Sequence, residues 1–305
     1  MLTLQGHTGP VRCVAFSPAE PSLISAGHDR QVRVWDIAAA REIRSFPGGS
    51  EQLYSLAISP GGRELATGGL DEDVRLFDAI SGEEQWAAPG HSPAITALAF
   101  SPNGKTLAVG VGDRFDGSAR GEVRLWDVLT GKWKADILSH IEHNEGWPQG
   151  TAWSLAYSPD GQLLAIGTGA QNVVLWDVAA ERVRGYLRQG TGVRALAFAP
   201  DGWSLATACG YTAELWDLTT STERLELRGH DGWIWSLAYS PDGRLLTTGS
   251  SDQTTRLWDV GSGRDLASYD WQAGKVYAVA FAADGMTAAA GCESGAVVMW
   301  DVDVV

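Results

Sequence analysis

The sequence of 305 residues is 44% hydrophobic and 20% charged, which is the composition of a folded globular protein. Its formal net charge of −14 argues against binding to nucleic acid or to an anionic membrane, because both require positive charge. The sequence contains no recognisable secretory signal and no apolar run approaching the ~20 residues of a membrane span. Three scattered cysteines indicate neither a disulfide framework nor a zinc site, and they favour a cytoplasmic location.

The chain opens with a short apolar segment at 2–4 and continues as seven copies of one pattern. Each copy contains an aromatic residue followed by aspartate, and successive copies lie 42, 49, 50, 40, 42 and 42 residues apart. A second marker, a turn written SPDG in its fullest form, starts at 17, 59, 101, 158, 199, 240 and 282. Two markers in step across seven copies indicate an internal repeat. The aromatic positions, termed WD sites below, are Trp35, Phe77, Trp126, Trp176, Trp216, Trp258 and Trp300.

Within a repeat, the hydrophobic pattern has the period of β-strands. Residues 229–266 contain four short runs separated by turns of Pro, Asp, Gly and Ser, and no segment keeps a helical period. Four strands per repeat, repeated seven times, predict an all-β ring of small antiparallel sheets that forms one domain over residues 1–305.

The two ends of the chain complement each other. Residues 2–4 precede Gly6-His7 much as residues 225–227 precede Gly229-His230, so the chain begins with an outer strand that has no sheet of its own. The seventh repeat stops at 301–305 without room for its outer strand. We expect residues 2–4 to complete the last sheet and close the ring, because closure removes exposed sheet edges.

These recurring motifs resemble the WD-repeat β-propeller family over essentially the whole chain. The resemblance implies a single seven-bladed β-propeller with four-stranded antiparallel blades, and a buried tetrad of His, Ser or Thr, Asp and Trp in each blade. The two repeats that match this tetrad fully carry His7, Ser25, Asp29 and Trp35 in the first, and His230, Thr248, Asp252 and Trp258 in the sixth.

Other repeats depart from the tetrad pattern. Phe77 replaces tryptophan in the second repeat, and Gln189 and Gln272 hold the histidine position in the fifth and seventh. The third repeat keeps His91 and Trp126, but its turn is interrupted.

The repeat spacing is broken in two places. Seven extra residues fall near 113–121, between the second and third strands of the third repeat, and eight fall within 139–150, before the fourth repeat. Because the strands alternate in direction, both insertions should emerge on the narrow face of the ring. We expect them to form a wall there that carries Arg114, Phe115, Asp116, Trp147 and Pro148. The alternative is neutral length drift in tolerant surface loops.

The start of each innermost strand supplies a second group of candidate residues. The position five residues before each turn holds Arg12, Tyr54, Thr96, Trp153, Arg194, Trp235 and Tyr277. The position seven before it includes Trp233 and Lys275. In a propeller these side chains converge on one mouth, and Trp, Tyr and Arg dominate interface hot spots. The alternative is that the aromatic side chains merely fill the central channel. The predicted partner-binding residues are Arg12, Tyr54, Trp153, Arg194, Trp233, Trp235, Lys275 and Tyr277, with Phe115 and Trp147 from the insertions.

Catalysis has little support in the sequence. His140, Glu142, His143 and Glu145 are of the types that bind metals, but they lie in an inserted loop and not on a rigid element. We interpret them as part of a solvated loop and keep a metal-dependent enzyme as one alternative. No GxSxG or GxGxxG motif occurs, so we expect no catalytic residue, no metal and no cofactor.

The sequence therefore favours a monomeric, non-catalytic scaffold that binds a protein or peptide on its narrow face. Aromatic side chains would anchor the partner, while Arg12, Arg194 and Lys275 would select its acidic groups. The main alternative is a sensor or regulatory propeller of a larger bacterial signalling kinase or ATPase. That alternative arises because the chain starts on the closing strand and stops five residues after Trp300.

Overall fold

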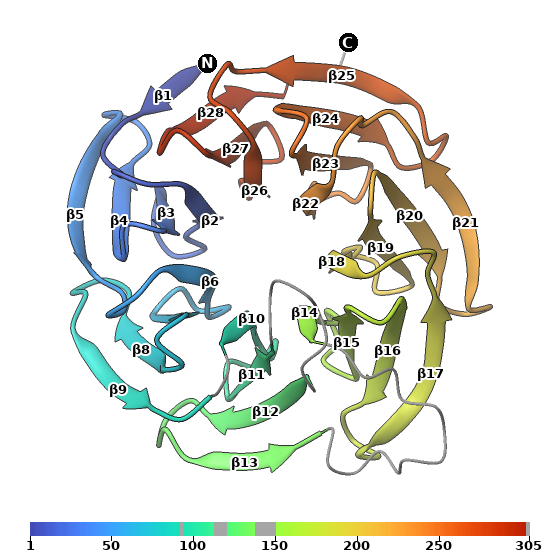
Figure 1. Ribbon diagram of the computed structural model, residues 1–305, viewed down its shortest axis with the longest axis horizontal. Coiled ribbons are helices and arrows are strands. Elements are labelled where there is room, and N and C mark those ends of the chain that lie inside the picture. The colour runs from blue at the N-terminus through green and yellow to red at the C-terminus, as the bar shows by residue number, and fades with distance from the viewer. Residues whose placement is uncertain (92–93, 113–120, 138–150, 303–305) are drawn as a thin grey trace.

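A computed structural model describes residues 1–91, 94–112, 121–137 and 151–302. These residues form 28 strands and no helix, arranged as seven four-stranded antiparallel sheets around a common axis (Figure 1). The prediction of a seven-bladed all-β propeller is confirmed. The part of the chain described here holds no helix long and apolar enough to cross a membrane.

Each of the first four blades consists of consecutive strands that run from the axis to the rim. Blade 1 contains β2 (Val11–Phe16), β3 (Ser22–Gly27), β4 (Gln31–Asp36) and β5 (Arg41–Pro47). Blade 2 contains β6 (Leu53–Ile58), β7 (Glu64–Gly69), β8 (Val74–Asp78) and β9 (Glu84–Ala88). Blade 3 contains β10 (Ile95–Phe100), β11 (Thr106–Val111), β12 (Glu122–Asp127) and β13 (Trp133–Asp136). Blade 4 contains β14 (Ala152–Tyr157), β15 (Leu163–Thr168), β16 (Asn172–Asp177) and β17 (Arg182–Arg188).

Blades 5 and 6 repeat this order, and blade 7 is built from both ends of the chain. Blade 5 contains β18 (Val193–Phe198), β19 (Ser204–Cys209), β20 (Thr212–Asp217) and β21 (Thr222–Leu227). Blade 6 contains β22 (Ile234–Tyr239), β23 (Leu245–Ser250), β24 (Thr254–Asp259) and β25 (Asp265–Asp270). Blade 7 contains β26 (Val276–Phe281), β27 (Thr287–Cys292), β28 (Val297–Asp301) and β1 (Leu2–Leu4).

The N-terminal strand closes the ring. β1 pairs antiparallel with β28, with Leu2 opposite Met299 and Leu4 opposite Val297. Leu4 is only 2% exposed and packs in an apolar cluster with Val11, which lies in blade 1. The expected closure is therefore confirmed, and it joins the first blade to the last through both hydrogen bonds and core packing.

The hydrophobic core lies between the blades. The second strand of a blade is covered on both faces by its neighbours, and β3 is buried along its whole length. This strand ends in a glycine in blades 1 and 2 because the start of the inner strand approaches it closely. A Cβ on Gly27 would collide with the Pro10 carbonyl, and one on Gly69 would collide with that of Gln52.

Every innermost strand carries a bulge at the same place. In β2, Val11 lies opposite Gly27 and Cys13 lies opposite Ala26, so Arg12 is an extra residue with no partner in the ladder. Such a bulge redirects the side chain of the extra residue. The seven extra residues are Arg12, Tyr54, Thr96, Trp153, Arg194, Trp235 and Tyr277, the same set that the sequence placed five residues before each turn.

Candidate functional site

Buried tetrads hold the loops that surround the mouth of the channel. In blade 1, the Trp35 indole donates to Ser25 Oγ at 2.8 Å, and Ser25 Oγ lies 2.7 Å from His7 Nε2. His7 Nδ1 lies 2.9 Å from Asp29 Oδ1. Because the Asp29 carboxylate can only accept, His7 Nδ1 carries a proton and donates to it, and in the neutral imidazole Nε2 then accepts from the Ser25 hydroxyl.

Blade 6 contains the same arrangement. Trp258 Nε1 donates to Thr248 Oγ1 at 2.9 Å, Thr248 Oγ1 lies 2.7 Å from His230 Nε2, and His230 Nδ1 lies 2.7 Å from Asp252 Oδ2. Burial alone would raise the pKa of Asp252, but hydrogen bonds from His230 and Thr254 outweigh it and hold that pKa below its usual value. The structure thus brings together all eight residues predicted for these two tetrads.

The departures from the tetrad pattern in blades 5, 7 and 3 differ from one another. In blade 5, Gln189 is buried at the histidine position, where its amide can accept from Trp216 Nε1 (3.1 Å) and donate to Glu214 Oε2 (2.9 Å). In blade 7, the sequence predicts Gln272 at the histidine position. That prediction was wrong, because Gln272 is exposed. The Trp271 ring instead packs 5.3 Å from Trp300, because an indole gains more than an amide from burial against tryptophan.

Blade 3 lacks the hydroxyl of the tetrad altogether. Val109 lies opposite Arg124, as Ser25 lies opposite Arg33 in blade 1. His91 is fully buried, and neither of its ring nitrogens makes a hydrogen bond of good geometry among the described residues, although the nearby backbone of Glu72 and Ala88 acts to raise its pKa. Burial, followed by the charge of Arg124, lowers the pKa of His91 to about 4, so this histidine is neutral at physiological pH.

The bulge residues converge on one opening of the channel. Arg12 stacks on the Tyr277 ring at 4.0 Å and lies 5.3 Å from the Trp235 ring. Arg194 stacks on Trp153 at 4.3 Å and on Trp235 at 4.5 Å. The Trp235 ring is therefore shared by two guanidinium groups, an arrangement that cation–π attraction stabilises.

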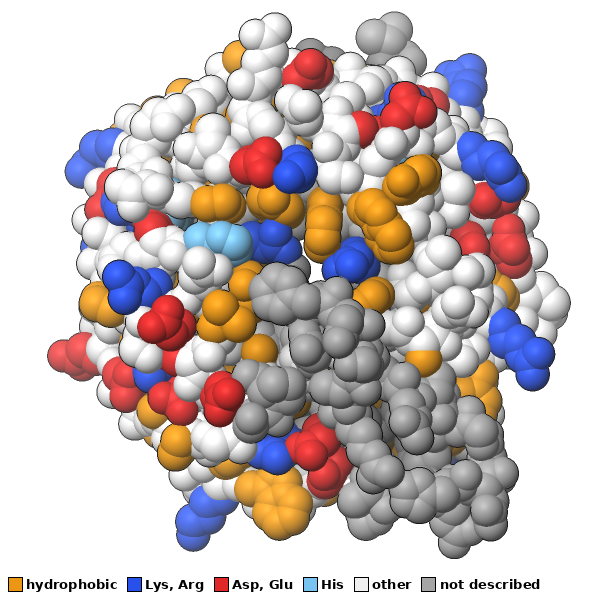
Figure 2. Space-filling model, viewed as in Figure 1, with side chains coloured by type: hydrophobic (Ala, Val, Ile, Leu, Met, Phe, Trp, Pro, Cys, Tyr) orange, Lys and Arg blue, Asp and Glu red, His pale blue; other side chains and the backbone are white. Residues whose placement is uncertain are grey.

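One further aromatic residue extends this group outward. Arg194 lies 5.0 Å from the Trp233 ring, and Trp233 meets Tyr211 edge-on at 6.2 Å. Figure 2 shows hydrophobic side chains in an arc at the central opening with basic groups between them. We call this group the narrow mouth and define it as Arg12, Trp153, Arg194, Trp233, Trp235 and Tyr277.

The two arginines of the narrow mouth are poorly solvated. Burial lowers the pKa of Arg12, and burial together with the charge of Arg12 lowers the pKa of Arg194 to about 10. Neither guanidinium forms an ion pair with a carboxylate among the described residues, and the Nε of each lacks a hydrogen-bond partner there. Both remain charged at neutral pH, so the mouth contains concentrated positive charge in an acidic protein.

Other predicted site residues are less available to a partner. Tyr54 is only 8% exposed and lies behind Arg12 at 5.7 Å. The space between Thr96, Trp153, Arg194 and Trp235 is about 10 Å³, so side chains fill the channel at this level. Lys275 Nζ already lies 3.0 Å from Glu293 Oε1. The channel-filling alternative therefore describes the interior, while the side chains of the narrow mouth are only partly buried.

Two sets of predicted residues lie outside the described part of the chain. Phe115 and Trp147, together with Arg114, Asp116 and Pro148, fall in 113–120 and 138–150, as do His140, Glu142, His143 and Glu145. Within the described residues, no group of three or more His, Cys, Asp or Glu side chains could hold a metal ion.

Sequence reasoning missed three residues beside the mouth, all in turns between second and third strands. His28 meets the Tyr54 ring edge-on at 5.4 Å, Tyr211 contacts Trp233, and Glu293 pairs with Lys275. His28 directly precedes the tetrad residue Asp29. Examining the residue before the tetrad aspartate in every repeat would have identified His28.

Comparison with known families agrees with this architecture. The model of the WD domain, G-beta repeat, matches residues 1–36, 40–78, 82–127, 139–177, 221–259 and 263–301. The chain belongs to the WD40 repeat family. The longest stretch without a match, 178–220, covers most of blade 5, where this WD40 propeller replaces histidine by Gln189.

Several curated WD40 relatives resemble the chain. WD repeat-containing protein SL1-17 of Schistosoma mansoni is 32% identical over 43% of this chain and 42% of its own length. Small ribosomal subunit protein RACK1 of Caenorhabditis elegans is 28% identical over 43% and 41%. Nuclear distribution protein PAC1 of Coccidioides posadasii is 27% identical over 83% and 57%. Each match covers less than two thirds of the relative. Membership of the WD40 family fits a protein-interaction scaffold.

Proposed function

We propose that this propeller is a non-catalytic scaffold that binds an acidic peptide segment, or a partner domain presenting one, at the narrow mouth. The observation that carries the proposal is the pair of desolvated guanidiniums, Arg12 and Arg194, with no carboxylate ion-paired to them among the described residues. A buried charge without a counter-ion is costly, and a carboxylate from a partner would supply that counter-ion.

The geometry favours a carboxylate flanked by apolar or aromatic residues. A guanidinium recognises a carboxylate through paired N–H donors, and the bond is stronger where water is excluded. Trp153 and Trp233 already lie against Arg194, so a partner side chain could pack on their outer surfaces. Because side chains fill the channel below, the partner would sit on the mouth without threading the ring.

The proposal can be tested with a randomised peptide library selected against the native protein. We expect the selected peptides to be enriched in Asp or Glu beside an aromatic residue, and to bind more weakly as ionic strength rises. Trp153→Ala with Trp235→Ala should weaken their binding at least tenfold, and Arg194→Gln should abolish the acidic preference.

Two control variants match these changes away from the mouth. Trp203→Ala and Arg244→Gln alter highly exposed side chains in turns at the opposite ends of the inner strands, and they should leave binding unchanged. Selected peptides that bind the double tryptophan variant as tightly as the native protein would place the site elsewhere.

A second candidate is a regulatory propeller within a larger signalling protein. Apoptotic protease-activating factor 1 of Danio rerio is 29% identical over 45% of this chain, yet the match covers only 11% of that protein. Repeats of this kind therefore occur as small parts of long chains. The sequence of the complete reading frame would decide between the two candidates, and the same mouth would serve in either.

A further inference from the structure

We call the contact between two neighbouring blades a seam. In three seams, a side chain of the outer strand of one blade donates to a backbone carbonyl of the next blade, at the same position of the repeat each time. Arg44 of blade 1 donates to the Ala79 carbonyl at 3.0 Å, and Trp86 of blade 2 donates to the Val128 carbonyl at 2.9 Å. Arg224 of blade 5 donates to the Val260 carbonyl at 2.6 Å. Each acceptor lies two residues after a WD site, so the repeat provides an acceptor for a long donor side chain in each of these seams.

The seam between blades 3 and 4 has the acceptor position but not the donor, as do the seams that follow blades 4 and 6, where Gly185 and Ala267 hold the donor register. Ala135 lies opposite Leu125, which is the register of Arg44 opposite Val34 in blade 1. Alanine cannot reach Val178, whose carbonyl has the equivalent position in blade 4. The neighbouring Lys134, at the register of Arg224, turns back into its own blade and lies 3.1 Å from Thr106 Oγ1.

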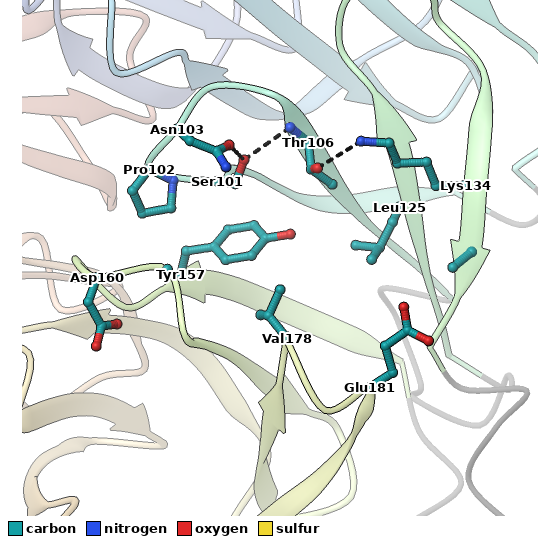
Figure 3. A pocket seen from close by; sticks show the side chains of 12 residues that line it. Ser101, Pro102, Asn103, Thr106, Leu125, Lys134, Tyr157, Asp160, Val178 and Glu181 are labelled. Atoms are coloured by element: carbon teal, nitrogen blue, oxygen red, sulfur yellow. Dashed lines mark hydrogen bonds between the residues drawn. The ribbon is translucent and has the colours of Figure 1, made fainter.

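A pocket of about 540 Å³ lies where that donor is missing (Figure 3). Its apolar wall includes Leu125, Val178 and the Tyr157 ring, which projects into the space. Burial raises the pKa of the Tyr157 phenol. Tyr157 ends β14, whereas Trp153 of the narrow mouth lies near its start, so the pocket opens toward the opposite face of the ring.

The charges around the pocket favour a cationic guest. Lys134 is paired with Asp127 at 3.2 Å, and Asp160 is occupied by the Ser158 hydroxyl at 2.6 Å. The exposed Glu181 carboxylate forms no ion pair among the described residues, and Figure 3 shows it directed toward the pocket. One carboxylate beside an aromatic ring and a backbone carbonyl suits a guanidinium.

We propose that the seam between blades 3 and 4 binds an arginine side chain of a partner polypeptide. The guanidinium donates to the Val178 carbonyl as Arg44 and Arg224 do to theirs, pairs with Glu181, and lies against Tyr157. This second site is independent of the narrow mouth and selects the opposite charge. A protein with both sites could hold two segments on its two faces.

The first test supplies the missing side chain from the protein itself. Ala135→Arg should place a guanidinium in the pocket and raise Tm by about 2 °C, as expected for one added hydrogen bond. Ala38→Arg adds the same charge to an exposed turn of blade 1 and should leave Tm unchanged. A folded Ala135→Arg protein with a lower Tm would show that the seam does not accept a guanidinium.

The second test uses N-acetyl-arginine methylamide as the probe in an NMR titration of the full chain. We expect saturable shifts of the Leu125 and Val178 methyl resonances, with weak, millimolar affinity. The neutral isostere N-acetyl-citrulline methylamide should bind at least fivefold more weakly, and Glu181→Gln should weaken arginine binding about threefold. Ala135→Arg should abolish the shifts.

Each remaining outcome counts against the proposal. Equal binding of the arginine and citrulline probes would exclude recognition of the guanidinium charge. Unchanged shifts in Ala135→Arg would place the probe elsewhere, and the absence of shifts at these methyls would exclude the site. Because the readout is local to the seam, these results are separable from any failure of the narrow-mouth proposal.

Discussion

The imidazole of His91 lies 5.2 Å from the indole of Trp126, yet no hydroxyl bridges the two rings, and Trp126 Nε1 lacks a hydrogen-bond partner among the described residues. The corresponding rings of His7 and Trp35 lie 6.3 Å apart and are bridged by the Ser25 hydroxyl. Blade 3 therefore preserves the two rings of a tetrad without the group that connects them.

Restoring that hydroxyl should stabilise the protein. Val109→Thr keeps the side-chain volume and places a hydroxyl where Ser25 and Thr248 stand in blades 1 and 6. We expect the free energy of unfolding to rise by about 1 kcal/mol, because two buried donors or acceptors gain a partner. Urea denaturation measures the change. Val123→Thr, at a buried site of the same blade, is the control and should destabilise.

His91 should also make stability fall in mild acid. Its pKa of about 4 in the folded protein lies below its ordinary value of 6.5, so the unfolded chain binds more protons between these values. Stability from this group is full above pH 6.5 and is lost as pH falls toward 4. We therefore compare the free energies of unfolding of His91→Leu and the native protein. The difference in favour of the variant should be roughly 2 kcal/mol larger at pH 4.5 than at pH 7.5. A constant difference across that range in denaturation curves would contradict the assignment.

Glu214 should make the stability of the protein fall as pH rises, the opposite of the effect of His91. Burial, followed by the charges of Glu223 and Glu226, raises the pKa of Glu214 to about 7 in the folded protein. The folded chain then binds more protons than the unfolded chain between pH 4.5 and 7, so this contribution to stability is present at low pH and lost as pH rises. After allowance for solvent screening, Glu214→Gln should raise the free energy of unfolding by roughly 1 kcal/mol at pH 8. It should have little effect at pH 4.5. Urea denaturation at the two pH values measures the difference.

Closure of the ring should depend on one short strand. Leu4→Ala removes a buried side chain at the contact between blades 7 and 1, and we expect it to cost about 3 kcal/mol in thermal or urea unfolding. Thr3→Ala changes an exposed residue of the same strand and should cost less than 0.5 kcal/mol, roughly the limit for surface substitutions. Similar costs for the two variants would mean that β1 contributes only backbone pairing.

Much of the fold follows from the sequence because the repeat is local. The spacing of the WD sites predicted the number of blades, and the resemblance between residues 2–4 and 225–227 predicted the closing strand. The resemblance to the WD-repeat family implied that His7 pairs with Asp29 and His230 with Asp252, and the structure contains both pairs. The number of blades and the closing strand need only a short stretch of chain and its periodicity to be predicted.

The tertiary structure decided how distant repeats meet. Arg12 and Arg194 share the Trp235 ring only because the bulges of three different blades aim their extra residues at one axis. Gln272 was misplaced because the choice between it and Trp271 depends on packing against Trp300. The pocket beside Ala135 lies between two blades, since Ala135 and Leu125 belong to blade 3 and Tyr157 and Val178 to blade 4. Periodicity within one repeat contains no information on such contacts, since packing between blades determines them.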